Sequence, residues 1–262
     1  MKNILTTTLL AAVAAAVSQA APIPVNACGT NLNVAGATYV LTQNLSCPGI
    51  AVNITADNVV FDLQGFTITR QGTAQGAAII TALGPSCVAT AGVQVRGGTI
   101  SNYSTGVAIC VPGSLPQKTH AQITKMKFLN NANGVALFNA VGNDVSDNVI
   151  DGTAATAGMV WPAGIYLGNS TDNTLYNNRI TNNARNGILL ANQSSNNIVK
   201  GNQAGLNKVD GVAVDASSQG NILVSNITRS NGQFDLSDAS NACGTNTWKA
   251  NVFVTANQPC IQ

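Results

Sequence analysis

Asparagine recurs at an almost constant spacing in the second half of this 262-residue chain. Five segments begin with Asn and carry a second Asn five residues later: NDVSDNVI, NTLYNNRI, NIVKGNQA, NILVSNIT and NTWKANVF. They start at Asn143, Asn173, Asn197, Asn221 and Asn246, which are 30, 24, 24 and 25 residues apart. A unit of this size cannot bury its own apolar face, so the period is typical of a solenoid in which neighbouring units stack.

Glycine marks a second repeated position. It precedes short alternating runs such as TGVAI, NGVALF and NGILLA, and in QFDLSD the residue Gln233 takes its place. The glycines of this series are Gly76, Gly106, Gly134, Gly164, Gly187 and Gly211. Alternating apolar and polar residues indicate β-strands, and these runs recur every 22 to 30 residues. The sequence therefore predicts stacked β-coils.

The choice of asparagine has a physical reason. Equivalent residues of stacked coils lie about 4.8 Å apart, so a column of like charges would repel at every step. An amide both donates and accepts hydrogen bonds, and Asn tolerates the left-handed backbone of tight corners. We therefore expect two Asn columns beside two apolar inward columns. The inward residues would be Val145, Leu175, Val199, Leu223 and Trp248, and Ile150, Ile180, Ala204, Thr228 and Phe253.

Few residues carry a charge. Asp, Glu, Lys and Arg make up 8% of the chain, against about 25% in ordinary soluble domains, and every acidic residue is Asp. The scarcity of Glu and Lys, both strong helix formers, argues against an α-rich fold. A net charge of +2 provides no long-range field for nucleic acid or an anionic membrane, and we expect neither as a partner.

Residues 1–20 have the features of a secretory signal peptide. Lys2 precedes the apolar run ILTTTLLAAVAAAV, and the small residues Ser18 and Ala20 precede a predicted cleavage site after Ala20. A membrane anchor is the alternative, but the run is shorter than the roughly 20 residues that a spanning helix needs. We expect an exported product, extracellular or periplasmic, with no membrane span once the signal is removed.

Six cysteines suit an oxidising compartment, where disulfides are their ordinary use. Because a solenoid is built from local contacts, neighbouring cysteines are expected to pair. The predicted pairs are Cys28 with Cys47, Cys87 with Cys110, and Cys243 with Cys260. The chain has no C-x-x-C motif and a single histidine, His120, so no metal site is predicted.

The repeat N-x-x-x-x-N-x-I followed by N-G-I-x-L resembles the right-handed parallel β-helix repeat of the pectin-lyase-like superfamily. The segments LTQNLSCPGIAVNITADNVVFDLQGFTI and CGTNTWKANVFVTANQPCI are also similar to stretches of bacterial members. The resemblance implies an all-β fold: a single-stranded right-handed parallel β-helix of about eight coils with disulfide-bonded end caps. After the signal peptide (1–20), we expect an N-terminal cap (21–55), the coils (56–240), and a last coil with the C-terminal cap (241–262).

Two insertions interrupt the repeat: CVPGSLPQKTH from Cys110 to His120 and DGTAATAGMVWPAG from Asp151 to Gly164. Function on solenoids usually lies beside such loops. Extending the register collects charged and aromatic residues on one outward face, at the edge of the second insertion. The candidate substrate-binding residues are Asp147, Asp151, Trp161, Tyr176, Arg179 and Lys200. Aromatic rings can stack on sugars and cations can meet carboxylates, so this face suits an anionic sugar; an exposed Asp–Arg ion pair is the alternative.

A second cluster supplies the candidate catalytic residues. Aligning GVAVDA with QFDLSD makes Asp215 and Asp235 outward neighbours, roughly 8 Å apart, and two carboxylates at that distance can hydrolyse a glycosidic bond with inversion. Solvated surface aspartates are the alternative. The N-T-D, G-H-G and R-I-K motifs of polygalacturonase-like proteins and the D-P-H-D of alginate epimerases are absent. No cofactor is predicted, and a Ca²⁺ site lacks the necessary acids on consecutive rungs.

Three functions follow from the sequence. The first is a secreted protein that binds a uronate-containing polysaccharide or cell-surface glycan and, if it is an enzyme, cleaves it as a lyase or glycoside hydrolase. The second is a noncatalytic surface or matrix scaffold, such as an adhesin. The third is a periplasmic protein resembling the β-helix copper-delivery accessory of nitrous oxide reductase. The sequence supports the third least, because soft metals prefer Met, His and free Cys.

Overall fold

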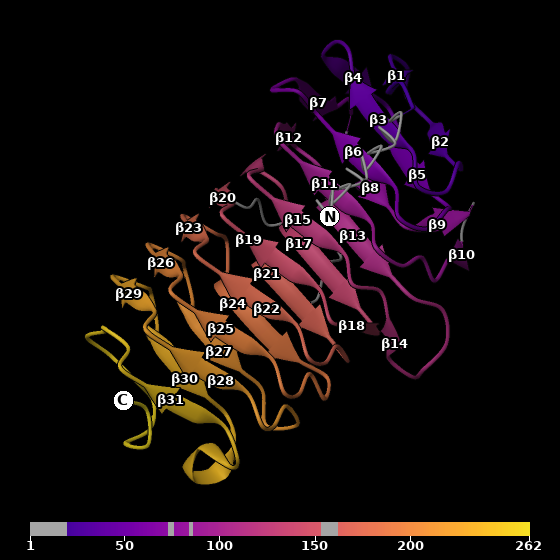
Figure 1. Cartoon of the computed structure of the whole chain (residues 1–262). Coiled ribbons are helices and arrows are strands. Elements are labelled where there is room, and N and C mark those ends of the chain that lie inside the picture. The colour runs from indigo at the N-terminus through magenta and orange to yellow at the C-terminus, as the bar shows by residue number, and fades with distance from the viewer. Residues whose placement is uncertain (1–19, 73–75, 84–85, 153–161) are drawn as a thin grey trace, which may run out of the picture.

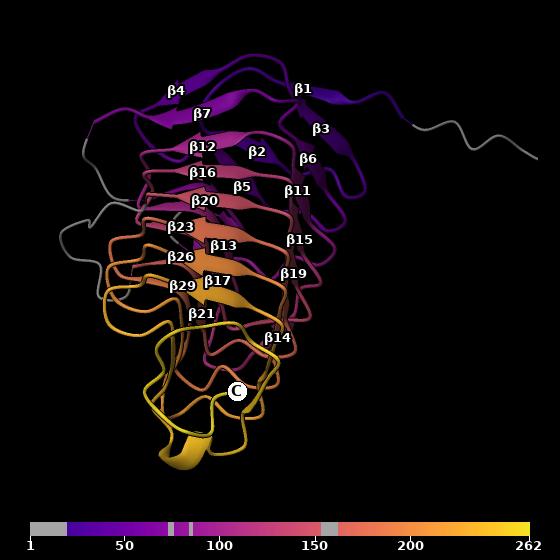
Figure 2. The same cartoon turned by 90° about the vertical axis from the view of Figure 1, so that its left-hand side faces the viewer.

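The chain winds into a right-handed parallel β-helix, as the repeat predicted (Figures 1 and 2). The structure is a computed structural model that describes residues 20–72, 76–83, 86–152 and 162–262. The expected signal peptide, apart from Ala20, therefore lies outside the described residues, as does Trp161. Among the described residues, no helix is both long enough and apolar enough to cross a membrane.

Each turn contributes short strands to three main sheets, and Figure 2 shows their rungs stacked one above another. The ten-stranded sheet contains β1 (Ile23–Val25), β3 (Thr38–Leu41), β6 (Val60–Asp62), β11 (Gln94–Arg96), β15 (Gln122–Thr124), β19 (Asp144–Ser146), β22 (Thr174–Tyr176), β25 (Ile198–Lys200), β28 (Ile222–Val224) and β31 (Thr247–Lys249). The eight-stranded sheet contains β4 (Leu45–Cys47), β7 (Thr67–Arg70), β12 (Thr99–Ser101), β16 (Lys127–Leu129), β20 (Val149–Asp151), β23 (Arg179–Thr181), β26 (Gln203–Gly205) and β29 (Ile227–Arg229).

The nine-stranded sheet closes each turn. It contains β2 (Thr30–Leu32), β5 (Val52–Ile54), β8 (Ala77–Ile80), β13 (Thr105–Cys110), β17 (Asn133–Phe138), β21 (Ala163–Gly168), β24 (Asn186–Ala191), β27 (Val212–Val214) and β30 (Leu236–Asp238). Two small pairs stand outside the main sheets: β9 (Ala82–Leu83) with β10 (Ser86–Cys87), and β14 (Gln117–Lys118) with β18 (Ala140–Val141). A short 3₁₀ helix, η1 (Asn241–Cys243), lies near the C-terminus. The segment 21–55, expected as a cap, itself carries β1 to β5.

Both predicted asparagine columns form. In the first, the side-chain Nδ2 of Asn173 donates to Oδ1 of Asn197 at 2.9 Å, and Asn197 donates to Asn221 at 3.1 Å. The backbone N–H of each Asn donates to the same Oδ1 of the next coil, as Asn173 does to Asn197 at 3.0 Å. The second column repeats this pattern from Asn148 to Asn251. These amides are buried except for the partly exposed Asn246 and Asn251 at the ends, and a buried polar group is stable only when it is hydrogen-bonded.

A third polar column was not predicted. Asn183 donates to Asn207 at 2.6 Å, Asn207 donates to Asn231 at 2.9 Å, and Asn231 donates to the carboxylate of Asp235 at 2.8 Å. The first three members are 24 residues apart, so the same period that marks the first two columns would have revealed them. An aspartate suits the end of the column because an ionised carboxylate only accepts hydrogen bonds and has no N–H that needs a further acceptor.

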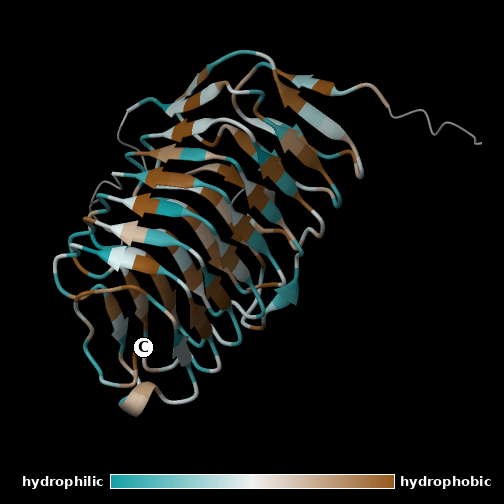
Figure 3. Cartoon of the chain, turned by 60° about the vertical axis from the view of Figure 1, so that its left-hand side comes forward, coloured by the Kyte–Doolittle hydropathy of each residue, from teal (hydrophilic) through white to brown (hydrophobic). Residues whose placement is uncertain are grey.

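The predicted apolar columns fill the interior. Leu175 pairs with Val145 and Val199, and Leu223 pairs with Trp248, all buried. The parallel series from Ile150 is buried as far as Thr228, whereas Phe253 is partly exposed and packs against the core. Strands alternate between hydrophobic and hydrophilic residues, and the corners are largely hydrophilic (Figure 3).

The glycine column is in register from Gly106 to Gly211, but both ends of the predicted series are wrong. The strand pairing places Ala78, not Gly76, opposite Gly106, and Asp235, not Gln233, opposite Gly211. The shift of two residues brings Asp235 beneath Asn231, where it accepts the last amide of the third column. Within the column the rungs approach closely, since a Cβ on Gly134 would lie 2.9 Å from the carbonyl oxygen of Gly164.

The three disulfides join the predicted pairs. The Cα atoms are 5.6 Å apart in Cys28–Cys47, 5.2 Å apart in Cys87–Cys110 and 6.1 Å apart in Cys243–Cys260. The first and last bridges lie in the end segments, where they tie down terminal coils whose strand edges have no further neighbour.

Candidate functional site

The predicted face lies at the corner between the ten-stranded and eight-stranded sheets. Corner residues adopt the left-handed conformation, as at Asp147 (φ 56°) and Asn177 (φ 55°), so the chain turns sharply between the two sheets. Tyr176 and Lys200 flank the corner on one side and Arg179 on the other, while Asp151 lies at the far end of β20. The structure adds three exposed lysines to this corner. We call Lys125, Lys127, Arg179, Lys200 and Lys249 the cationic edge.

Tyr176 is the aromatic group on this face. It pairs with Lys200 on the next strand, and its side chain is 45% exposed. The corner residue Gly201 lies under its ring: a Cβ there would be 3.5 Å from Cε2 of Tyr176. The ring therefore lies at van der Waals distance from the corner, with nearly half of the residue exposed to solvent.

The carboxylates on this face bond to neighbouring coils, not to cations. Asp147 accepts a hydrogen bond from Nδ2 of Asn177 at 2.5 Å, and Asp151 accepts from Thr181 at 3.0 Å and from Asn182 at 2.7 Å. Within the described parts of the chain the ion pair that forms is Arg96–Asp62, at 3.0 Å between Nε and Oδ2. The alternative interpretation of this face as an Asp–Arg ion pair is therefore wrong for Arg179, and the cations of the edge remain available to a ligand.

The predicted catalytic pair does not form. Asp235 is 1% exposed, and its two oxygens accept hydrogen bonds from Asn231, Val254 and Thr255. Burial alone would raise the pKa of Asp235, but the N–H groups of Val254, Asn231 and Thr255 hold this pKa below its ordinary value. Asp215 lies four positions away in the register, since Val214 pairs with Asp238. Asp235 is thus a structural acceptor, and the expectation that both carboxylates point outward is wrong.

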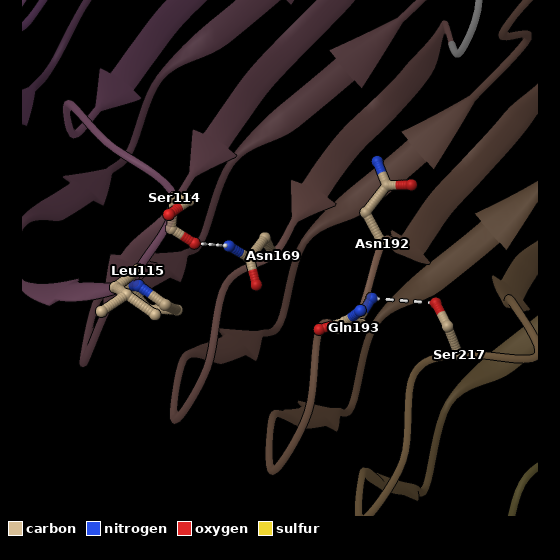
Figure 4. A pocket seen from close by; sticks show the side chains of 7 residues that line it. Ser114, Leu115, Asn169, Asn192, Gln193 and Ser217 are labelled. Atoms are coloured by element: carbon tan, nitrogen blue, oxygen red, sulfur yellow. Dashed lines mark hydrogen bonds between the residues drawn. The ribbon is translucent and has the colours of Figure 1, made fainter.

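A hollow that sequence reasoning missed lies at the corner between the nine-stranded and ten-stranded sheets (Figure 4). Its volume is about 500 Å³, and the first insertion forms one wall. The lining residues are Ser114, Leu115, Pro116, Asn169, Asn192, Gln193 and Ser217. The sequence indicated the insertion as a place for function, and the spacing of 24 residues from Asn169 to Gln193 and from Gln193 to Ser217 is the signal that could have placed these residues together.

Possible metal donors are dispersed. In the described ranges, no group of three or more His, Cys, Asp or Glu residues lies close enough to hold a metal ion. The six cysteines are all bonded in disulfides, and the thioether of Met126 is buried in the core. His120 is exposed, with its ring against Gly142. Because copper prefers thiolate, thioether and imidazole ligands, the described residues do not fit a copper site.

Solved structures share the fold at low sequence identity. The complex of XylC with xylose matches with a TM-score of 0.57 and 14% identity, over 78% of this chain and 38% of XylC. Full-length tailspike protein 2 from Escherichia coli O157:H7 bacteriophage CAB120 matches with a TM-score of 0.50 and 10% identity, over 84% of this chain and 34% of the tailspike. The chain thus spans well under half of either protein, and these matches show the fold alone. A search of curated proteins found no match.

One family model covers almost the whole helix. It is described as "Periplasmic copper-binding protein (NosD)" and matches residues 31–260, from β2 to the last cysteine bridge. Three functions were derived from the sequence, and the copper-delivery function was the one that the sequence supported least. That function is nevertheless the one that pointed to this family. The extent of the match shows that the chain belongs to the NosD family of parallel β-helix proteins.

Proposed function

We propose that this NosD-family protein is exported and binds an acidic, uronate-containing polysaccharide along the cationic edge. The observation that carries the proposal is the exposed ring of Tyr176 between Arg179 and Lys200, neither of which forms an ion pair in the described structure. The expected signal peptide and the periplasmic description of the family support export.

The stacking of coils suits a linear polymer. Side chains at equivalent positions recur about every 4.8 Å along the axis. Lys127 and Arg179 share one row, two coils apart with Val149 between them, and Lys200 flanks this row across the corner on the coil after Arg179. A chain of uronate residues laid along this row would meet cations with its carboxylates, and charge-assisted hydrogen bonds are the stronger kind. The ring of Tyr176 would stack on the C–H face of one sugar.

The aspartates of this face have a different part in the proposal. One coil of this face carries aspartates in place of cations: Asp144, Asp147 and Asp151. Asp147 and Asp151 keep acceptor capacity beyond their bonds to Asn177, Thr181 and Asn182, since a carboxylate has about four lone-pair sites. They can therefore accept hydrogen bonds from sugar hydroxyls. Since Asp215 and Asp235 form no outward pair, the proposal is binding without cleavage.

Calorimetry with oligogalacturonate and alginate oligomers tests this function. Replacing both Arg179 and Lys200 by Ala should weaken binding at least about tenfold, because each charge-assisted hydrogen bond contributes about 1.5 to 3 kcal/mol. Tyr176→Ala should weaken it less, and added salt should weaken binding by the intact chain. Arg229→Ala is the matched control, since Arg229 is exposed at the other edge of the same sheet.

Equal affinity of the double variant and the intact chain would refute the proposal. Absorbance of unsaturated ends and assays of reducing ends should stay at background during the same incubations; a rise in either would show cleavage. No binding to acidic oligomers, together with adherence to cells or matrix, would favour the scaffold function instead.

A further inference from the structure

The hollow at the corner of the nine-stranded and ten-stranded sheets has a fixed wall. The insertion that forms it starts at the Cys87–Cys110 disulfide and ends at β14, which pairs with β18. Two stacked amides of the corner hold its tip: Asn139 donates to the carbonyl of Gly113 at 2.7 Å, and Asn169 donates to that of Ser114 at 2.9 Å. Figure 4 shows the Ser114–Asn169 bond at one end of the hollow and Gln193 with Ser217 at the other.

The opposite wall is built from a strained turn. Asn192 (φ 55°) and Gln193 (φ 66°) are consecutive residues in the left-handed conformation, which is rare for glutamine. Hydrogen bonds hold both: Asn192 N–H donates to Asp215 at 2.7 Å, and Gln193 N–H donates to Ser217 at 2.9 Å. Strain of this kind persists only where the surroundings enforce it, and here the bonds to Asp215 and Ser217 do so.

The turn presents side-chain amides to the hollow. Nδ2 of Asn192 is occupied by the hydroxyl of Tyr166 at 2.8 Å, and Nδ2 of Asn169 by the carbonyl of Ser114 and by Asn139. Among the described residues, no hydrogen bond engages Oδ1 of Asn169, Oδ1 of Asn192 or the side-chain amide of Gln193. Two acceptors and one group that both donates and accepts therefore belong to residues that line the hollow.

Apolar surface completes the hollow. Leu115 is 75% exposed at its rim, next to Pro116. A sugar ring has hydroxyls that donate and accept and a C–H face that packs on apolar groups, which matches this combination of amides and aliphatic carbon. The volume of about 500 Å³ lies within the roughly 300 to 1,000 Å³ typical of small-molecule sites.

The electrostatics select a neutral ligand. None of the seven lining residues is ionisable, and a charged group placed there would lose hydration without gaining a counter-ion. The carboxylate of Asp215 is bonded to two of the lining residues, since its oxygens accept from Asn192 N–H and from the N–H and hydroxyl of Ser217. We infer that this hollow binds a neutral pyranose unit of a glycan, independently of the cationic edge, and that Asp215 is a positioning residue for its turn.

Nuclear magnetic resonance of the purified chain tests this inference. Titration with xylotriose, cellotriose and maltotriose should shift the side-chain amide signals of Asn169, Asn192 and Gln193 for at least one of these sugars. A dissociation constant of about 1 mM is expected for so open a site, and salt should not change it because no charge is involved. Gln193→Leu and Leu115→Ser should each weaken binding about tenfold, an effect of about 1.4 kcal/mol.

The controls separate this site from the cationic edge. Gln203→Leu makes the same chemical change at an exposed position on β26 and should leave the affinity unchanged. Thermal unfolding should be unaffected by all three substitutions, since each replaces an exposed side chain. No saturable shift with any of the three neutral sugars, or equal binding by Gln193→Leu, would overturn the inference. The acidic oligomers titrate the other corner, so the two proposals can fail separately.

Discussion

The coils before Asn143 and those after it build the same sheets, but different kinds of contact stabilise them. From Asn173 on, successive members of the amide columns are 24 or 25 residues apart, and each caps the corner N–H of the coil before it. In the first coils the caps are single side chains that belong to no continuous column, although Asn143 and Asn148 still cap the N–H groups of Ala121 and Met126. Asn44 caps Thr67 N–H across 23 residues, and Asp57 caps Ala91 N–H across 34.

The difference shows what an amide column requires. Each Asn must lie directly above the next, so the register at the corner decides whether a column continues, not the length of the coil: Asn143 and Asn173 are 30 residues apart and still bond at 2.7 Å. The earlier coils compensate with larger interior side chains, including Tyr39, Phe61, Tyr103 and Phe128, and with two of the three disulfides. The later coils are thus held by repeated polar contacts, and the earlier coils by larger apolar side chains and covalent bonds.

The largest effect is expected from breaking an amide column. In Asn202→Leu, the N–H and Nδ2 of Asn178 lose their shared acceptor, and the carbonyl of Leu175 loses its donor. Each buried group left unsatisfied costs about 1 to 3 kcal/mol, so the free energy of unfolding should fall by about 4 kcal/mol in urea denaturation. The matched change among the earlier coils is Asn44→Ala, which removes one exposed acceptor and should cost about 1 kcal/mol or less. Equal losses would contradict the comparison.

Removing the first disulfide tests how much covalent bonds stabilise the earlier coils. Replacing Cys28 and Cys47 by Ser opens a loop with a sequence separation of 19 and should lower stability by about 3 kcal/mol. Thermal unfolding monitored by circular dichroism measures the loss. A melting temperature equal to that of the intact chain would show that the earlier coils need no covalent support.

Asp235→Asn tests the end of the third column. The second oxygen of Asp235 accepts from Val254 N–H and Thr255 N–H, and the amide would place a donor against these donors, at a cost of about 2 kcal/mol. Because the folded pKa lies below the ordinary value, the contribution of the carboxylate is present above the unfolded pKa of about 3.9. It is lost as the pH falls through the folded pKa. The gap between variant and intact chain should therefore narrow in urea titrations below about pH 4.

The smallest effect is a gain of stability from Asp210→Asn. Burial raises the pKa of Asp210, opposed by hydrogen bonds from Phe234 N–H and Ser237 and by the charge of Arg185. The charged form is thus disfavoured in the folded chain above this pKa, and the cost disappears as the pH falls below it. An amide keeps an acceptor for Phe234 N–H, now at 3.0 Å from Asp210. We expect a gain of about 0.5 to 1 kcal/mol at neutral pH, shrinking in acid; a loss at neutral pH would contradict this account.

Much of the fold could be predicted because one period sets both polar and apolar columns. Once Asn173 and Asn197 are placed one turn apart, Leu175 and Val199 must stack as well, and the structure confirms both. The ends of the glycine series could not be predicted in the same way. Alternation of period two permits a shift of two residues with no change in which face is buried, and the contact between Asn231 and Asp235 selects the observed register.

The two sites also differ in how far the sequence could predict them. Four of the predicted binding residues, Asp147, Tyr176, Arg179 and Lys200, lie together at one corner because register alone places them there. The hollow joins Ser114, Asn169 and Gln193 from an insertion and two coils. An insertion has no repeat to fix its path, so its position depends on contacts such as that between Asn169 and Ser114.

The amino-acid sequence by itself determined the coil period, the amide and apolar columns of the later coils, and the pairing of the cysteines. Those features arise from neighbours one turn apart, whose identities repeat along the chain. Only the tertiary structure decided that Asp235 is a buried acceptor and that a neutral hollow stands beside the first insertion. The first depends on the contact of Asn231 with Asp235, and the second on the path of an insertion that has no counterpart in the other coils, so the period alone fixes neither.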